Sequence, residues 1–163
     1  MGLPIQKAPM YKCVLPVSQI EVKYRPFLVK EQNYLLIARE SEDPTQIFDA
    51  IMDLVKAVTE GEVDASKIAL VDLEYLFLQV RTKSVGETAK VPLMCMAEGC
   101  DGVGYSEIDL TKIEVDTSGV LESKIEIGSN LIVELRPPDS KLIYEVEGLN
   151  EVEIIKPILR QCM

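Results

Sequence analysis

The chain has 163 residues, with 27 acidic against 17 basic residues, a formal net charge of −10 and no histidine. This length predicts one domain, or one domain with a small appendage, and a hydrophobic content of 47% is enough to fill a core. The negative charge disfavours direct binding of nucleic acid, and the absence of histidine excludes histidine-dependent catalysis and histidine metal ligands.

No apolar run approaches the roughly 20 residues that a membrane-spanning helix needs, and residues 1–10 contain no apolar stretch of signal-peptide length. We therefore expect no membrane association and a protein that works in the cytoplasm in which it is made. The negative charge can serve solubility alone, or it can present an acidic face to a basic partner.

The N-terminal half is expected to be mostly helical. Residues 1–18 contain three prolines and are expected to form an extended, poorly ordered arm. Ile20–Tyr24 alternates apolar and polar residues, as a half-buried strand does, and Pro26 ends it. Val29–Glu40 is rich in good helix formers and predicts a first helix.

The second helix has the clearest signals. Asp43 can accept hydrogen bonds from free backbone amides, Pro44 suits the first helical position, and Gly61 suits the left-handed conformation beyond the end. An apolar stripe at helical spacing is formed by Ile47, Ile51, Leu54 and Val58.

A third helix is predicted near Asp72–Ser84. Its main apolar stripe consists of Leu73, Leu76, Phe77 and Val80, and Tyr75 and Leu78 add apolar groups elsewhere on its circumference. A helix that is apolar almost all round is buried in its own core or in a partner. The core is the preferred interpretation. The alternative is that part of the Tyr75–Leu78 cluster is exposed and holds apolar helices of another chain.

The residues after Gly86 favour β-structure. Val91, Leu93 and Cys95 share one face of a candidate strand, a glycine-rich loop follows, and Tyr105–Val115 predicts the next strand. Lys124–Ile127 and Leu131–Arg136 flank Gly128-Ser129-Asn130, a strong hairpin signal.

Pro137 and Pro138 end this hairpin, and the chain from Asp139 on is expected to form two short helices broken at Gly148. Leu142–Val146 could instead be a strand. The predicted class is therefore α+β: an N-terminal strand and about three helices, then a small antiparallel β-sheet and short C-terminal helices. We expect an arm over 1–18 and one domain over 19–163, with a helical part at about 28–86, a β-rich part at about 90–136 and a C-terminal helical piece at about 139–163.

Cys95 and Cys100 are the only pair of residues with a metal-like spacing. Two thiolates on one turn can hold half of a tetrahedral zinc site, and the other half would come from Cys13, Cys162, carboxylates or another chain. A solvated hairpin with incidental thiols is the preferred interpretation, so no metal ligand and no cofactor are predicted. The pair also lacks the spacing of a redox C-x-x-C motif.

No catalytic site is predicted. Asp72 and Glu74 are two residues apart on a helix and do not face each other. Gly102-Val103-Gly104 lacks the Gly-Lys-Ser/Thr that a phosphate-binding loop requires. We therefore expect a protein that is not an enzyme, although an enzyme that uses only carboxylates stays a third alternative.

Two long stretches carry a family resemblance: LPVS (Leu15–Ser18) with IEVKYRPFLVKE (Ile20–Glu31), and DLEYLFL (Asp72–Leu78) with Val80–Arg81 and Lys83–Glu87. Together they resemble the baseplate hub assembly proteins of T-even-type contractile-tailed bacteriophages, over about the first two-thirds of the chain. The resemblance implies a non-enzymatic tail protein that forms part of the baseplate hub or assists its assembly through protein–protein contacts. Its implied partners are other hub proteins and the tape-measure protein.

The resemblance also implies a location in the host cytoplasm during assembly, or in the tail baseplate of the virion, and it fits both a transient assembly chaperone and a permanent subunit. Members of that family commonly have a tight C-x-x-C in place of the looser Cys95–Cys100 spacing, and they tend to extend past the position of Met163. Divergence of this chain, a shortened form of the sequence, or a longer product made by frameshifting would each account for this. The rival function is a small metal-binding interaction module that uses Cys95 and Cys100 with thiols from a partner chain.

Overall fold

The computed structural model describes residues 8–97, 99–118, 124–128, 131–146, 148–150 and 152–162. The predicted α+β class is confirmed. In chain order the elements are β1 (Tyr11–Val14), β2 (Glu21–Tyr24), α1 (Val29–Glu40), α2 (Pro44–Val58), α3 (Leu70–Ser84), β3 (Thr88–Met94), β4 (Val103–Asp109), the 3-10 helix η1 (Leu110–Lys112), β5 (Lys124–Ile127), β6 (Leu131–Glu134), α4 (Leu142–Val146) and α5 (Ile155–Cys162).

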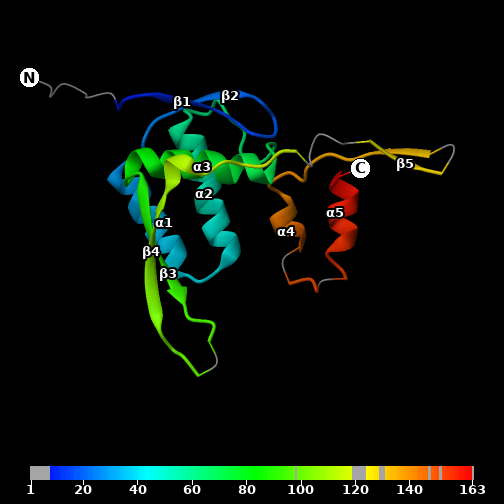
Figure 1. The fold of residues 1–163 in the computed structure, drawn as a ribbon. Coiled ribbons are helices and arrows are strands. Elements are labelled where there is room, and N and C mark those ends of the chain that lie inside the picture. Colours follow the sequence, from blue (N-terminus) through cyan, green and yellow to red (C-terminus); the bar gives the residue numbers. More distant parts are fainter. Residues whose placement is uncertain are drawn as a thin grey trace, which may run out of the picture.

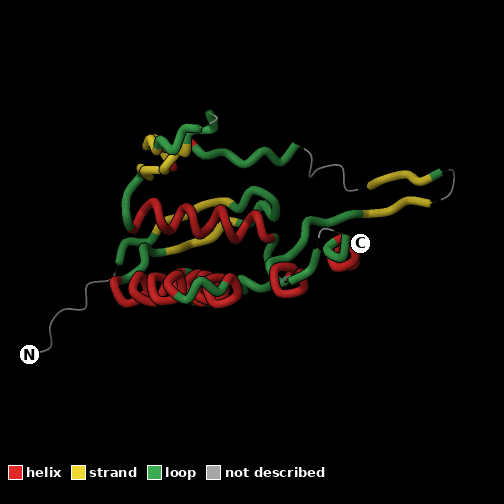
Figure 2. The backbone as a smooth tube through the Cα atoms, turned by 90° about the horizontal axis from the view of Figure 1, so that it is seen from below, coloured by secondary structure: helices red, strands yellow, loops and turns green. Residues whose placement is uncertain are grey.

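Helix α3 lies at the centre of the molecule. It crosses α2, which packs beside α1, and the β1–β2 hairpin lies against the same helices (Figure 1). Seen from below, α3 lies between the α1–α2 layer and the β3–β4 hairpin (Figure 2). The hydrophobic core is formed by residues of β1–β2, α2 and α3 and of the segments that join them: Leu15, Val22, Tyr24, Phe48, Leu54, Val55, Val58, Val63, Ala65, Leu73, Leu76 and Val80.

The N-terminal segment is extended, but the expectation that it is poorly ordered is wrong for its described part. Tyr11–Val14 pairs antiparallel with Glu21–Tyr24, and Leu15 is completely buried. Tyr11 and Cys13 pack against the core from the same face of the strand. The prolines around this strand were a misleading signal. Burial of the strand's apolar side chains stabilises the paired conformation over a free, extended arm. Residues 1–7 lie outside the described residues.

A buried carboxylate holds the turn between β1 and β2 on α3. Asp72 is 0% exposed, and its two oxygens accept hydrogen bonds from the backbone amides of Val17, at 2.8 Å, and Ser18, at 2.9 Å. Asp72 also lies in the first turn of α3, where a negative charge interacts favourably with the helix dipole. Two backbone donors and one carboxylate are therefore satisfied without water.

The segment after β2 is fixed to two helices. The backbone amide of Arg25 donates to the carbonyl of Val58, and that of Phe27 donates to Oγ of Ser84. The Arg25 guanidinium forms a two-pronged ion pair with Glu31, at 2.8 and 3.0 Å, and Glu31 also accepts the amide of Leu28 at the start of α1. The hydrogen bonds from Arg25 are the largest cause of the lowered pKa of Glu31. The start of α1 is thus set by contacts outside the helix as well as by its own sequence.

The predicted helix signals are largely confirmed. α1 has the predicted bounds, Asp43 caps α2 by accepting the amides of Thr45 and Gln46, and Gly61 adopts a φ of +79°. α3 begins at Leu70, two residues before the predicted start. Its first amide donates to the carbonyl of Pro138, a contact with a distant segment that no local pattern indicates.

The β-rich part forms two separate hairpins rather than one small sheet within the described residues. β4 begins at Val103, and the strand predicted over Tyr105–Val115 ends at Asp109, whose side chain accepts the amide of Thr111 and starts η1. The β5–β6 hairpin has the predicted pairing, although Ser129 and Asn130 lie outside the described residues.

The C-terminal part contains the two short helices expected, and the alternative of a strand over Leu142–Val146 is wrong. The ring of Tyr144 packs edge-on against Phe48 of α2, which favours a helix at this position over an isolated strand. Pro157 lies in the first turn of α5, where a backbone amide donor is not needed.

We predict that Asp72→Ala lowers the free energy of unfolding by about 2 kcal/mol, because it leaves the partly buried amides of Val17 and Ser18 without the buried carboxylate that accepts their hydrogen bonds. Urea unfolding followed by circular dichroism measures the change. Glu74→Ala, on the exposed side of the same helix, is the matched control and should change stability by less than about 0.5 kcal/mol. Equal stability of the two variants would contradict the role given to Asp72.

Candidate interaction surfaces

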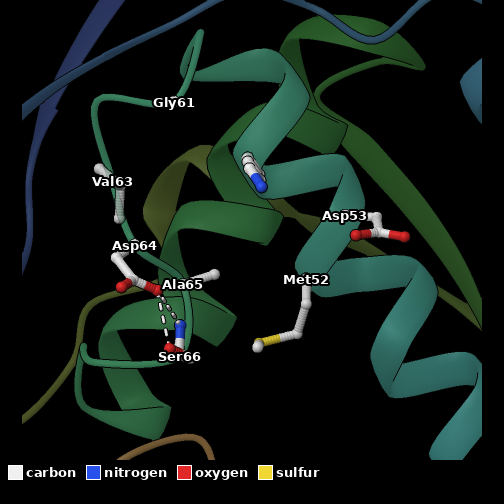
Figure 3. Close-up of a pocket in the computed structure, with 8 residues that line it drawn as sticks. Met52, Asp53, Gly61, Val63, Asp64, Ala65 and Ser66 are labelled. Carbon is white, nitrogen blue, oxygen red and sulfur yellow. Dashed lines mark hydrogen bonds between the residues drawn. The ribbon is translucent and has the colours of Figure 1, made fainter.

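One hollow in the described part of the molecule lies between α2 and the loop that follows it. It has a volume of about 420 Å³ and is lined by Met52, Asp53, Lys56, Gly61, Val63, Asp64, Ala65 and Ser66. Its two carboxylates do not converge: Asp53 points away from the loop, whereas Asp64 is turned towards Ser66 (Figure 3). Two acids arranged in this way cannot share a substrate between them as a general acid and a general base.

Asp64 has a structural task in its own loop. It accepts hydrogen bonds from the amide of Ser66, at 3.2 Å, and from its hydroxyl, at 2.7 Å, and it pairs with Lys67 at 2.8 Å. The hydrogen bonds from Lys67 and Ser66 lower the pKa of Asp64 to about 2. The group is ionised at neutral pH and already has its partners, so it is a poor proton donor or acceptor for catalysis.

The apolar cluster of α3 is mostly part of the fold. Leu76 is completely buried, and Tyr75, Phe77 and Leu78 are half-buried. Phe77 packs against the core, and η1 lies against the same helix. Little of this cluster is exposed for contact with another chain. The larger exposed apolar surfaces lie on other elements.

Helix α1 exposes apolar residues on the side that faces away from α2. Ala38 and Leu35 point inward, whereas Val29, at 74% exposed, and Ile37, at 66%, lie on the opposite side with Leu36. We call the exposed residues Val29, Leu36 and Ile37 the α1 face. Apolar residues on both sides of one helix were visible in the sequence, and they are the signal that could have identified this surface.

The β5–β6 hairpin also has an apolar side. Its register places Ile125 opposite Val133 and Ile127 opposite Leu131 on one side, while Lys124, Glu126 and Glu134 share the other side with Ile132. The hairpin extends away from the helices (Figure 1), and its strands pack mainly on each other. An isolated two-stranded hairpin has little stability in water, so contact with a partner would stabilise this one.

The β3–β4 hairpin ends in a third apolar region. Its pairing places Met94 opposite Val103 and Pro92 opposite Tyr105, on one side of the ribbon. Met94, Val103 and Tyr105 are all more than half exposed, and Met96 in the turn is 96% exposed. The tip projects beyond α1 and α2 (Figure 1). We call this region, Pro92–Tyr105, the finger.

The four cysteines lie in three different places. Cys95 and Cys100 are exposed near the end of the finger, Cys13 is half-buried in β1, and Cys162 is buried in α5. Burial raises the pKa of Cys13 to about 11. The pKa of Cys95 is lowered, because the backbone amide of Ala97 and then the thiol of Cys100 direct hydrogen bonds towards its sulfur. The thiol pair predicted from the spacing is therefore brought together, and the other two cysteines lie elsewhere.

The described residues contain no group of three or more cysteine, aspartate or glutamate residues placed to hold one metal ion. None of the described helices is both long enough and apolar enough to cross a membrane.

Comparison with known proteins gives one match. The family model described as "T4 bacteriophage base plate protein" matches residues 8–163, which is nearly the whole chain. No curated protein and no solved structure shows significant similarity. The match includes both of the stretches that carry the resemblance seen in the sequence, and it also covers the three exposed apolar regions.

We predict that iodoacetamide at neutral pH modifies Cys95 and Cys100 in the folded, metal-free protein well before Cys13 and Cys162. The first two thiols are exposed, whereas burial protects the others and raises the pKa of Cys13. Peptide mass spectrometry over a time course measures each rate, and modification in denaturant shows that all four can react. Labelling of Cys13 as fast as that of Cys95 would contradict the described packing of β1.

Proposed function

Because this chain belongs to the family of T4 bacteriophage base plate proteins, we propose that it acts in the baseplate hub. In this proposal it is a non-enzymatic tail protein that forms part of the hub, or assists hub assembly, through protein–protein contacts. Other hub proteins and the tape-measure protein are its partners. It works in the host cytoplasm during assembly, and as a permanent subunit it would also be found in the tail of the virion.

The observation that supports this proposal is the placement of exposed apolar side chains. The α1 face, the apolar side of β5–β6 and the finger are separate regions on different elements, and each exposes several large apolar residues. Scattered single apolar residues are normal on a protein surface, but groups of them mark places where another protein binds. Three such regions on a chain of 163 residues suit a protein that joins several neighbours.

The chemistry of the described part also favours a protein that binds over one that catalyses. The sequence contains no histidine, and the carboxylates in the hollow between α2 and the loop after it point in different directions. The buried acid, Asp72, is fully occupied by two backbone amides. Asp64 and Asp72 thus hold a loop and a turn in place, which is a structural use of their charge.

The alternative function, a metal-binding interaction module, has one observation in its favour: the thiols of Cys95 and Cys100 lie close together. It is compatible with a place in the baseplate, because a metal on the finger would itself join two chains.

We predict that the double variant Val29→Glu/Ile37→Glu folds normally but loses capture of hub partners. The chain is co-expressed with the neighbouring hub proteins and the tape-measure protein, and a pull-down measures capture. Both positions are exposed, so the added charges leave the core intact and act only on the α1 face. We expect at least a tenfold loss, since two apolar contacts are replaced by buried charges.

The matched control is Lys23→Glu, which changes the net charge by the same two units at an exposed position of β2, away from the α1 face. It should retain most of the capture. Quantitative mass spectrometry of purified virions then separates the two roles: a fixed copy number marks a subunit, and absence together with capture of the tape-measure protein marks a chaperone. Failure to capture any hub partner, together with absence from virions, would refute the proposed function.

A further inference from the structure

The turn of the finger brings two thiols to one side of the ribbon. The amide of Cys95 donates to the carbonyl of Gly102 at 2.9 Å, and the amide of Cys100 donates to the carbonyl of Ala97 at 3.1 Å. These bonds bring Cys95 and Cys100 to the same turn.

Gly102 leaves room for this arrangement. A Cβ atom at this position would lie 3.3 Å from Sγ of Cys100 and 3.9 Å from Cβ of Cys95. A side chain there would crowd the Cys100 sulfur, so glycine keeps the side of the turn that carries the thiols open. The two sulfurs are accessible from outside, since both cysteines are exposed.

We propose that Cys95 and Cys100 form half of a tetrahedral zinc site, and that the same two cysteines of a second copy of this chain complete it. Sulfurs on one zinc ion lie roughly 3.8 Å apart, given a zinc–sulfur bond of about 2.3 Å. Because both side chains lie beside Gly102 and are exposed, rotation of the two side chains can bring their sulfurs to this spacing.

The remaining ligands come from outside the chain. A structural zinc site needs four protein ligands, and the described residues contain no third cysteine, aspartate or glutamate grouped with this pair. Cys13 is in β1, packed against the core, and Cys162 is buried in α5, where Arg136 binds its carbonyl. Neither can reach the tip of the finger without breaking the fold.

A second copy can meet this chain at the tip of the finger, although both copies are negatively charged. Two chains with a net charge of −10 each repel one another, which opposes contact between their bodies. The finger reduces this repulsion, because its seven-residue strands place its tip roughly 23 Å from its base and keep the bodies of the two chains apart. That separation exceeds the screening length of about 8 Å at physiological salt.

The surroundings of the thiols suit such a contact. Met94, Met96 and Tyr105 are among the most exposed apolar residues described, and a tip-to-tip contact would cover them. A two-fold axis through the metal makes both halves equivalent, as in most protein dimers. Binding converts four thiols and one Zn²⁺ ion into a tetrathiolate complex with a charge of −2 and releases four protons.

The test uses the full chain, purified without chelator in oxygen-free buffer. We expect one zinc ion for every two chains by elemental analysis, and a mass of twice 18.2 kDa by light scattering. A chelator should return the mass to that of one chain. Cobalt in place of zinc should give the visible bands of a tetrahedral site together with thiolate-to-cobalt charge transfer.

The double variant Cys95→Ser/Cys100→Ser should lose both the metal and the dimer while keeping its fold, since both positions are exposed. Asp101→Asn is the matched control: it removes the neighbouring carboxylate and should keep both properties. Zinc bound by single chains, or no more zinc bound than in the double variant, would overturn the proposal. The proposed function does not depend on this site, and partner capture by the double variant separates the two.

Discussion

The Asp72 carboxylate is fully buried and accepts hydrogen bonds from the amides of Val17 and Ser18, 55 and 54 residues earlier in the chain. These bonds join the two stretches that carry the family resemblance, and the bond from Phe27 to Ser84 joins them again at the other end of α3. The rest of the fold depends on this junction, because it fixes the β1–β2 hairpin over the core that α2 and α3 share. The resemblance thus lies in residues that hold the structure together, whereas the exposed apolar regions lie largely outside them.

Local signals predicted most of the elements but not their contacts. Asp43, Pro44 and Gly61 determine the ends of α2 through their own backbone preferences, and the hairpin signal at Gly128 is equally local. The start of α3 at Leu70 was missed because it depends on a hydrogen bond to Pro138, 68 residues later. The arm was misjudged for the same reason, since the burial of Leu15 requires the distant helix that covers it.

The candidate surfaces were predictable only in part. The spacing of Cys95 and Cys100 indicated half of a metal site, but only the fold shows that Cys13 and Cys162 lie elsewhere. The all-round apolarity of α3 drew attention to Leu78, which is half-buried, while Val29 and Ile37 of α1 are the more exposed residues. Periodicity shows that a helix has apolar sides, but it does not show which side its neighbours cover.

We propose that this chain holds its partners through α1 and the two projecting hairpins, while α3 serves the core. Amide hydrogen exchange tests this by comparing the chain alone with the chain in a complex with its co-expressed hub partners. We expect new protection in Val29–Glu40 and in one or both of the β3–β4 and β5–β6 hairpins, while α3 is already protected in the free chain. A complex that protects only the hollow around Asp64, or leaves α1 and both hairpins unchanged, would contradict it.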